Sequence, residues 1–310
     1  MKVFDLHCDT LYKANETNQS IIQNDFEFSL KKAENYENYI QVMAIWIPDE
    51  YRNDRAFALA EHCYRRLQQE LQQQTVFQKC SDYSQKDSNY TVILSVEGGA
   101  VLGGKTERVK VLKEMGVRFL TLTWNDSNEI GDGIMCENPK GLTDFGKALI
   151  PELENHQIII DVSHASEPLF YDVVQYSTKP FVATHSNSRR YCHHKRNLTD
   201  EQFTILCQRG GIVGLNFHKY FLTDSGEAEF SDLQNHLEHF LSLGGENHIS
   251  LGSDFDGAEM PECITGAESI QNFYEYLLSQ NYKESLLQKI FYDNADNFLK
   301  KYDEESKEQL

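Results

Sequence analysis

The chain opens on the stretch "KVFDLHCDT" (residues 2–10), a short apolar run that ends in a histidine and an aspartate on either side of a cysteine. Valine and phenylalanine in such a run favour a β-strand. Imidazole and carboxylate are ligands of zinc and similar divalent ions. Because side chains alternate between the faces of a strand, His7 and Asp9 should share one face and Cys8 the other. The stretch therefore predicts a strand that ends in metal ligands, with Cys8 packed outward as a small hydrophobe.

Seven further runs of strand-like residues follow the first one along the chain. The eight runs lie at 3–9, 39–48, 91–99, 117–124, 158–164, 181–186, 211–217 and 248–257. Stretches of helical periodicity lie between many of them, at 54–74, 106–116, 143–156 and 231–245. Strands that alternate with helices indicate βαβ units and a parallel sheet. Eight of them predict a (β/α)8 barrel of the TIM type, and the 310 residues suit one such domain over 1–310.

An open doubly wound sheet is the alternative architecture. Such folds often carry a glycine-rich phosphate fingerprint after the first strand, and this chain has none there. The polar region 11–38 fits either a loop with a helix or a small hairpin. The residues from about 285 to 310 predict one closing helix.

Composition excludes several classes of partner. The chain has 29 Lys and Arg against 48 Asp and Glu, a formal charge of −19, which repels nucleic acid and anionic membranes. Its seven cysteines form no CxxC pair, so a reducing compartment is expected rather than a disulfide framework. No apolar stretch has the length of a membrane span or the features of a signal segment. We therefore expect a cytoplasmic protein that acts on a small molecule.

Acids and imidazoles recur where the strand-like runs end. They are His7, Asp9, Glu97, His164, His185 and Asp254. In a parallel barrel all these ends meet at one rim, where barrel enzymes place their sites. Each motif alone is weak evidence for a functional site, because buried histidines that form a hydrogen bond to a backbone carbonyl are common. Six together indicate function, since burying each unpaired charge costs several kcal/mol. One ion uses about four such groups, so the set predicts two metals, which a carboxylate can bridge at ~4 Å.

Three further histidines lie outside this set. His236 and His239 are spaced i,i+3 on a predicted outer helix and should form a solvated face. His218 lies just beyond the seventh run and is a candidate contact to substrate at the rim.

Six blocks in order resemble a known family. They are "DLHCDT", "SVEGG", "LTLTW", "DVSHAS", "THSNSRRYCHHKRNLTD" and "GSDFDG", which span residues 5–257. As a set they are similar to the membrane dipeptidase (renal dipeptidase) family of zinc peptidases among the amidohydrolase-like barrels. The resemblance implies that His7 and Asp9 bind one zinc ion, that His164 and His185 bind the second, and that Glu97 bridges both.

The resemblance also implies a reaction. A hydroxide shared by the two metals would attack the peptide bond of a dipeptide, Asp254 would transfer the proton, and Arg196 would grip the substrate carboxylate. Well-studied members have a histidine after "LTLT" that contacts the scissile carbonyl, whereas this chain has Trp124 followed by Asn125. An indole donates one hydrogen bond and never becomes a cation. Metal polarisation suffices, Asn125 or Asn128 substitutes, or the substrate range differs. The resemblance further suggests a homodimer.

Three alternative functions stay open at this point. The same metal site in the barrel can act on N-acyl amino acids or other small amides and esters, which the Trp124 departure favours. A metal-dependent nuclease is opposed by the acidic surface and by the opening HxD in place of HxH. A barrel that only binds a ligand is opposed by the complete set of predicted ligands together with Asp254.

Overall fold

Parallel strands form the centre of the computed structural model, which describes the backbone of residues 1–307 and the side chains of residues 1–305. The strands are β1 (Lys2–Cys8), β2 (Asn38–Trp46), β3 (Gln78–Lys79), β4 (Tyr90–Glu97), β5 (Val117–Thr121), β6 (Ile159–Asp161), β7 (Val213–Leu215) and β8 (Ile249–Leu251). Their order is β6-β5-β4-β2-β1-β8-β7, with β3 paired to β4, and every pairing among them is parallel.

The predicted sixth strand, 181–186, forms only two single bridges. Val182 bridges Asp161 of β6, and Ala183 bridges Val213 of β7, both in parallel. Pairing with β6 stops there because the backbone N–H of Thr184 donates to the Asp161 carboxylate at 3.0 Å, whereas one further backbone hydrogen bond, from Ser186 N–H to the carbonyl of Gly214 at 2.8 Å, continues toward β7. The segment still links the two ends of the sheet, so the strands form a ring and the TIM-type prediction is confirmed.

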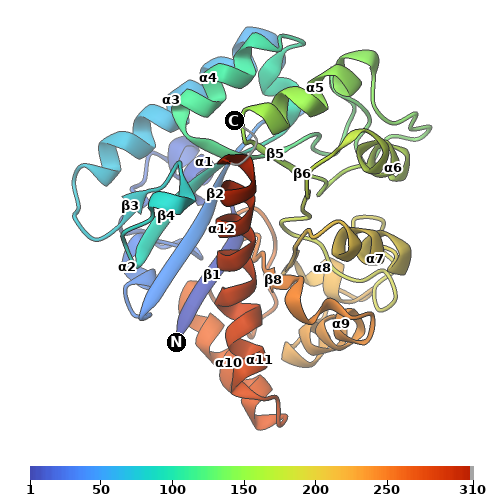
Figure 1. Cartoon of the computed structure of the whole chain (residues 1–310). Coiled ribbons are helices and arrows are strands. Elements are labelled where there is room, and N and C mark those ends of the chain that lie inside the picture. The colour runs from blue at the N-terminus through green and yellow to red at the C-terminus, as the bar shows by residue number, and fades with distance from the viewer. Residues whose placement is uncertain (308–310) are drawn as a thin grey trace.

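Helices surround this ring, as Figure 1 shows. They are α1 (Thr10–Thr17), α2 (Leu30–Ala33), α3 (Asn53–Leu71), α4 (Glu107–Met115), α5 (Asp144–Asn155), α6 (Glu167–Tyr176), α7 (Asp200–Gln208), α8 (Lys219–Leu222), α9 (Phe230–Ser242), α10 (Ile270–Ser279), α11 (Glu284–Gln288) and α12 (Asn294–Lys307). The four helical stretches predicted from periodicity correspond to α3, α4, α5 and α9. Region 11–38 contains α1 and α2 and no hairpin.

The predicted closing helix is present with one irregularity. A π-helical turn (Lys289–Asp293) joins α11 to α12, and residues 308–310 lie outside the described part. Figure 1 shows α12 (dark red) lying across the strands. Its Ala295 and Leu299 join the cluster of inward-facing side chains that includes Phe4 and Phe119. A buried ion pair between Arg118 of β5 and Asp303 of α12 fixes this contact.

Two apolar layers therefore hold the barrel together. The inner layer fills the ring and packs against α12, and the outer layer lies between the strands and the surrounding helices. Because α12 packs against inward-facing residues near the start of the strands, the opposite rim, where the strands end, is left for the candidate site.

Candidate active site

A β-bulge in β1 aims His7 into the ring. Leu6 belongs to the inner apolar layer and Cys8 to the outer one, and both are fully buried. The pairing of β1 with β2 slips between Asp5 and Cys8. At the slip, the Asp5 carboxylate accepts the N–H of His7 at 3.3 Å. Bulges re-aim side chains in this way next to active sites. Leu6 and His7 thus face inward in succession, and the predicted outward packing of Cys8 is confirmed.

The predicted metal ligands converge on Glu97, at the end of β4. His7 Nε2 lies 3.7 Å from Glu97 Oε2 and 3.3 Å from Asp9 Oδ2. On the other side, Glu97 Oε1 lies 2.9 Å from His164 Nε2 and 3.4 Å from His185 Nε2. Each oxygen of Glu97 therefore faces a different set of ligands. Within each set, the candidate ligand atoms lie within 4.8 Å of one another.

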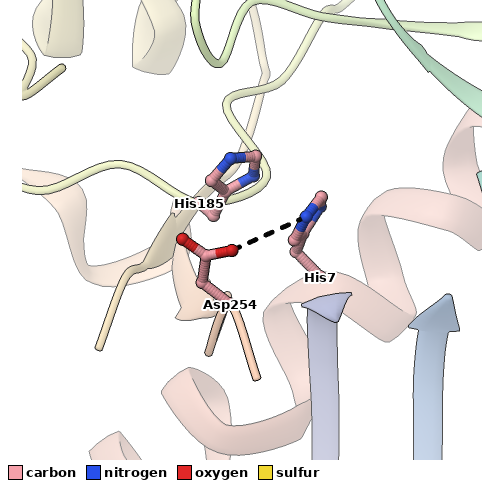
Figure 2. A group of neighbouring side chains, drawn as sticks. All are labelled: His7, His185 and Asp254. Atoms are coloured by element: carbon pink, nitrogen blue, oxygen red, sulfur yellow. Dashed lines mark ion pairs between the residues drawn. The ribbon is translucent and has the colours of Figure 1, made fainter. Parts of the chain in front are cut away.

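Asp254, which follows β8, closes the cluster beside His7 and His185. Figure 2 shows the Asp254 carboxylate turned toward His7, and Oδ1 lies 3.9 Å from His7 Nε2. The rings of His7 and His185 have centroids 3.9 Å apart. The other oxygen of Asp254, Oδ2, accepts a hydrogen bond from the amide of Asn216 at 2.9 Å. One carboxylate oxygen is thus held by the protein and the other faces the cluster.

Neighbouring side chains fix the tautomers of two histidines. Thr184 donates its hydroxyl proton to the Asp161 carboxylate at 2.7 Å, so it can only accept from His185 Nδ1, 2.9 Å away. The amide oxygen of Asn125 likewise accepts from His164 Nδ1 at 3.0 Å. Both histidines therefore present an unprotonated Nε2, and these two atoms lie only 3.1 Å apart. Two lone pairs at that distance repel unless a cation lies beside them.

Burial and charge shift the pKa values of the cluster strongly. Burial would lower the pKa of His7, but Glu97 and Asp9 outweigh it and raise that pKa to about 10. Burial lowers the pKa of His164 and His185 well below its usual value, and it raises the pKa of Glu97 well above. The Glu97 carboxylate is therefore costly to ionise without added positive charge.

The cluster fits divalent metal ions by its chemistry. Imidazole nitrogen and carboxylate oxygen suit zinc. Asp9 Oδ1 is buried and has no hydrogen-bond partner among the described residues, as expected of an atom reserved for a ligand. Hydrogen bonds at the other ring nitrogen, Nδ1, such as those of His185 with Thr184 and of His164 with Asn125, are also typical of metal-binding histidines.

A pocket of about 550 Å³ opens above the cluster and is lined in part by Glu97, His164 and Asp254. Arg196 also lines it, although its side chain is buried. Its Nη2 donates to the carbonyl of His185 at 3.3 Å, while its Nε has no partner among the described residues. A buried guanidinium with free donors is suited to bind an anionic group.

The three other candidate contacts also line this pocket. Trp124 packs edge to face against Trp46 at 4.8 Å between ring centroids. Asn125 lines the pocket, and its amide oxygen holds the ring of His164. His218 lines it too, and its Nδ1 accepts the backbone N–H of Glu259 at 3.1 Å. The structure thus brings these candidate site residues to one rim, while their roles stay predictions. Asn128 is not among the residues that line the pocket, and its amide donates to the carbonyl of Leu122 at 2.8 Å.

Sequence reasoning missed Thr184 and Asn216, which form hydrogen bonds to His185 and Asp254 respectively. Asn216 is the last residue but one of the seventh strand-like run, so the strand-end rule could have found it. The solvated face predicted for His236 was wrong. That residue is fully buried, and its Nδ1 accepts the N–H of Ser188 at 3.1 Å. It lies beneath the loop that leads from His185 to Arg196.

A ring of parallel strands with imidazoles and carboxylates gathered at their carboxyl ends is the arrangement of metal-dependent hydrolases of the barrel class. The sequence model that describes one such family, "Membrane dipeptidase (Peptidase family M19)", matches residues 1–309 of this chain. The chain belongs to the membrane dipeptidase family, as its sequence blocks suggested.

Known relatives agree with this assignment. Human Dipeptidase 3 is 30% identical over 209 residues, which is 65% of this chain, but this chain spans only 43% of the length of that relative. The crystal structure of the dipeptidase AC, a metallopeptidase of family M19, is similar with a TM-score of 0.90 and 27% identity, over 96% of this chain and 98% of that one. A metallopeptidase from Rhodobacter sphaeroides, liganded with a phosphinate mimic of the dipeptide L-Ala-D-Ala, is similar with a TM-score of 0.89 and 26% identity, over the same shares.

The described residues contain no helix with both the length and the apolar character needed to cross a membrane.

Proposed function

We propose that this chain is a dipeptidase that works with two bound zinc ions. The observation that carries the proposal is the convergence of buried imidazole nitrogens and carboxylate oxygens beside a buried guanidinium. His7 and Asp9 would hold one ion, His164 and His185 the other, and Glu97 would offer one oxygen to each. The ions would supply a water of lowered pKa and polarise the scissile carbonyl.

Arg196 binds and orients the substrate. Its free N–H groups donate to the terminal carboxylate of a dipeptide as a planar fork, which a lysine ammonium cannot reproduce. The Phe221 ring, 5.3 Å from the guanidinium carbon, supports it from one side. With the carboxylate held there, the peptide bond of a very short substrate reaches Glu97 and Asp254.

Asp254 moves the proton. Its Oδ2 is held by Asn216, so Oδ1 stays directed at the cluster, where it accepts a proton from the attacking water and passes it to the leaving amine. General acid–base catalysis of this kind requires the carboxylate within hydrogen-bond reach of both groups.

Metal analysis combined with a peptide panel tests this function. The purified chain, loaded with zinc, should hold two ions per chain and hydrolyse dipeptides. Arg196, which holds the terminal carboxylate, and a pocket of about 550 Å³ together favour short substrates. Hydrolysis should therefore fall sharply for peptides of four or more residues. Equal rates on long peptides would contradict the proposal.

An amidohydrolase acting on N-acyl amino acids, or on other small amides and esters, is the second candidate. The observation that favours it is Trp124, which presents an apolar ring to the pocket where well-studied relatives have histidine. Such a substrate has the carboxylate that Arg196 needs but no free amine. Rates measured side by side on Ala-Gly and N-acetylglycine separate the two candidates.

We also propose a homodimer in a reducing compartment. Resemblance to the family supports the dimer. The absence of any disulfide among the seven cysteines, all of which lie within the described residues, supports the compartment. Light scattering tests the first, and a count of seven titratable thiols in the denatured, unreduced protein tests the second.

A further inference from the structure

Three aromatic side chains form one wall of the pocket. Tyr12 lies on α1, Trp46 ends β2, and Trp124 follows β5. The rings of Tyr12 and Trp46 meet edge to face with centroids 4.8 Å apart, and the rings of Trp46 and Trp124 do the same at 4.8 Å. All three line the pocket, together with Met135, which is 40% exposed. We call Tyr12, Trp46 and Trp124 the aromatic wall.

The aromatic wall and the guanidinium come from different sides of the ring. Going round the barrel, β2 is followed by β4, β5, β6 and then the 181–186 segment, which places β2 opposite that segment. Arg196 lies in the loop that follows the 181–186 segment, whereas Trp46 ends β2. Glu97 ends β4, next to β2.

This arrangement fixes the orientation of a bound dipeptide in the pocket. With the carboxylate on Arg196 and the scissile bond beside Glu97, the chain of the substrate continues toward the side of β2. Its N-terminal residue therefore meets the aromatic wall. Lys13, the lysine that lines this pocket, is already paired with Asp256 at 3.2 Å and Glu27 at 3.4 Å. The wall therefore presents ring surface and no unpaired cation of its own.

Resting on the dipeptidase function proposed above, we propose that the aromatic wall is the subsite for the side chain of the N-terminal residue and selects a large apolar one, such as phenylalanine or leucine. Burying such a side chain against aromatic rings, in place of an alanine methyl, raises kcat/KM by about 10- to 100-fold. Trp124 then sets specificity at the position where relatives have a histidine.

A kinetic panel tests the subsite. On the zinc-loaded chain, kcat/KM should be about 10- to 100-fold higher for Phe-Gly than for Ala-Gly, and nearly equal for Gly-Phe and Gly-Ala. Trp124→Ala should bring the first ratio to within about threefold of one, and Trp124→Phe should keep most of it. Tyr176→Ala, at an exposed tyrosine of α6 outside the pocket, is the matched control and should leave the ratio unchanged.

Three results would overturn the inference. They are a ratio near one in the parent chain, a ratio unaffected by Trp124→Ala, and a preference for Lys-Gly over Phe-Gly, since the acidic Glu16 also lines the pocket. If Trp124→Ala does not fold, Trp46→Leu replaces it with the same expected loss.

Fluorescence gives a readout that does not depend on turnover. Trp46 and Trp124 are the two tryptophans of the chain, so tryptophan emission, excited at a wavelength where tyrosine does not absorb, reports on this wall alone. A phosphinate mimic of Phe-Gly should shift the emission at concentrations at least tenfold lower than the mimic of Ala-Gly. Selective binding without hydrolysis of any dipeptide would refute the proposed function and keep the subsite. Hydrolysis without selectivity would refute only the subsite, and binding of neither mimic would refute both.

Discussion

Thr184 controls which nitrogen of His185 is free to bind a metal. Its hydroxyl donates to Asp161 at 2.7 Å and accepts from His185 Nδ1 at 2.9 Å. Thr184→Val keeps the shape of the side chain but leaves His185 Nδ1–H buried without an acceptor. An unsatisfied buried donor costs about 1–3 kcal/mol. The ring then gains by moving its proton to Nε2, which removes the lone pair that faces Glu97.

The expected effect is a loss of metal affinity. Changes to such outer contacts of a ligating histidine lower affinity by about 10- to 100-fold, or roughly 1.4–2.7 kcal/mol, in line with the cost of the unsatisfied donor. Zinc affinity is measured by competition with a chromogenic chelator, and the free energy of unfolding of the metal-free protein by urea titration.

Thr121→Val is the matched control. Thr121 is buried, and its hydroxyl donates to the same Asp161 oxygen at 2.7 Å without contacting a histidine. Both variants should lose similar stability, about 1–3 kcal/mol, but only Thr184→Val should lose zinc affinity. Equal zinc affinities in the two variants would refute the tautomer argument.

Three further predictions follow from the same contacts. Arg196→Lys should raise KM for dipeptides roughly tenfold or more with little change in kcat, because a point charge replaces a fork that holds the substrate carboxylate; steady-state kinetics on Ala-Gly check this. Asp254→Asn should lower kcat by about 10²–10⁴-fold while zinc content stays unchanged, and full activity with full zinc occupancy would exclude the proton-transfer role. Burial lowers the pKa of His236 to about 4, so between pH 6.5 and 4 the unfolded chain binds more protons than the folded one, and the free energy of unfolding decreases as the pH is lowered. Urea titrations should show a loss of about 3 kcal/mol from pH 6.5 down to pH 4 that is absent in His236→Gln.

The strand-end rule explains how much of the site could be predicted. His7, Glu97 and His185 lie far apart in the sequence, yet each ends a strand-like run, and a parallel barrel brings all such ends together. Hydrophobic patterning was sufficient for this step, because runs of β-branched and aromatic residues marked the strands without any knowledge of tertiary contacts.

Local irregularities of the backbone could not be predicted from the sequence, because they depend on contacts between distant segments. Strict alternation puts Leu6 and His7 on opposite faces of a strand, whereas the slip at Asp5 turns both inward. The sixth run appeared to be an ordinary strand, but the Asp161 carboxylate accepts the N–H of Thr184 and ends the pairing of this segment with β6. The i,i+3 spacing of His236 and His239 gave no sign that a loop covers one of them.

Backbone conformation adds a constraint that neither pattern nor composition carries. His164 and Asp254 both adopt left-handed φ angles of 64°, and Asp256 has φ 70°. Such angles are uncommon for residues with a side chain, cost of order 1–3 kcal/mol each, and persist only where the surroundings enforce them. Glycine would relax the backbone but would remove the imidazole or carboxylate. A strained turn directly after a strand lets the side chain reach the centre of the ring at the point where the chain leaves it. Asparagine tolerates this region well, so the loss of turnover expected of Asp254→Asn reports on the missing carboxylate rather than on a disturbed turn.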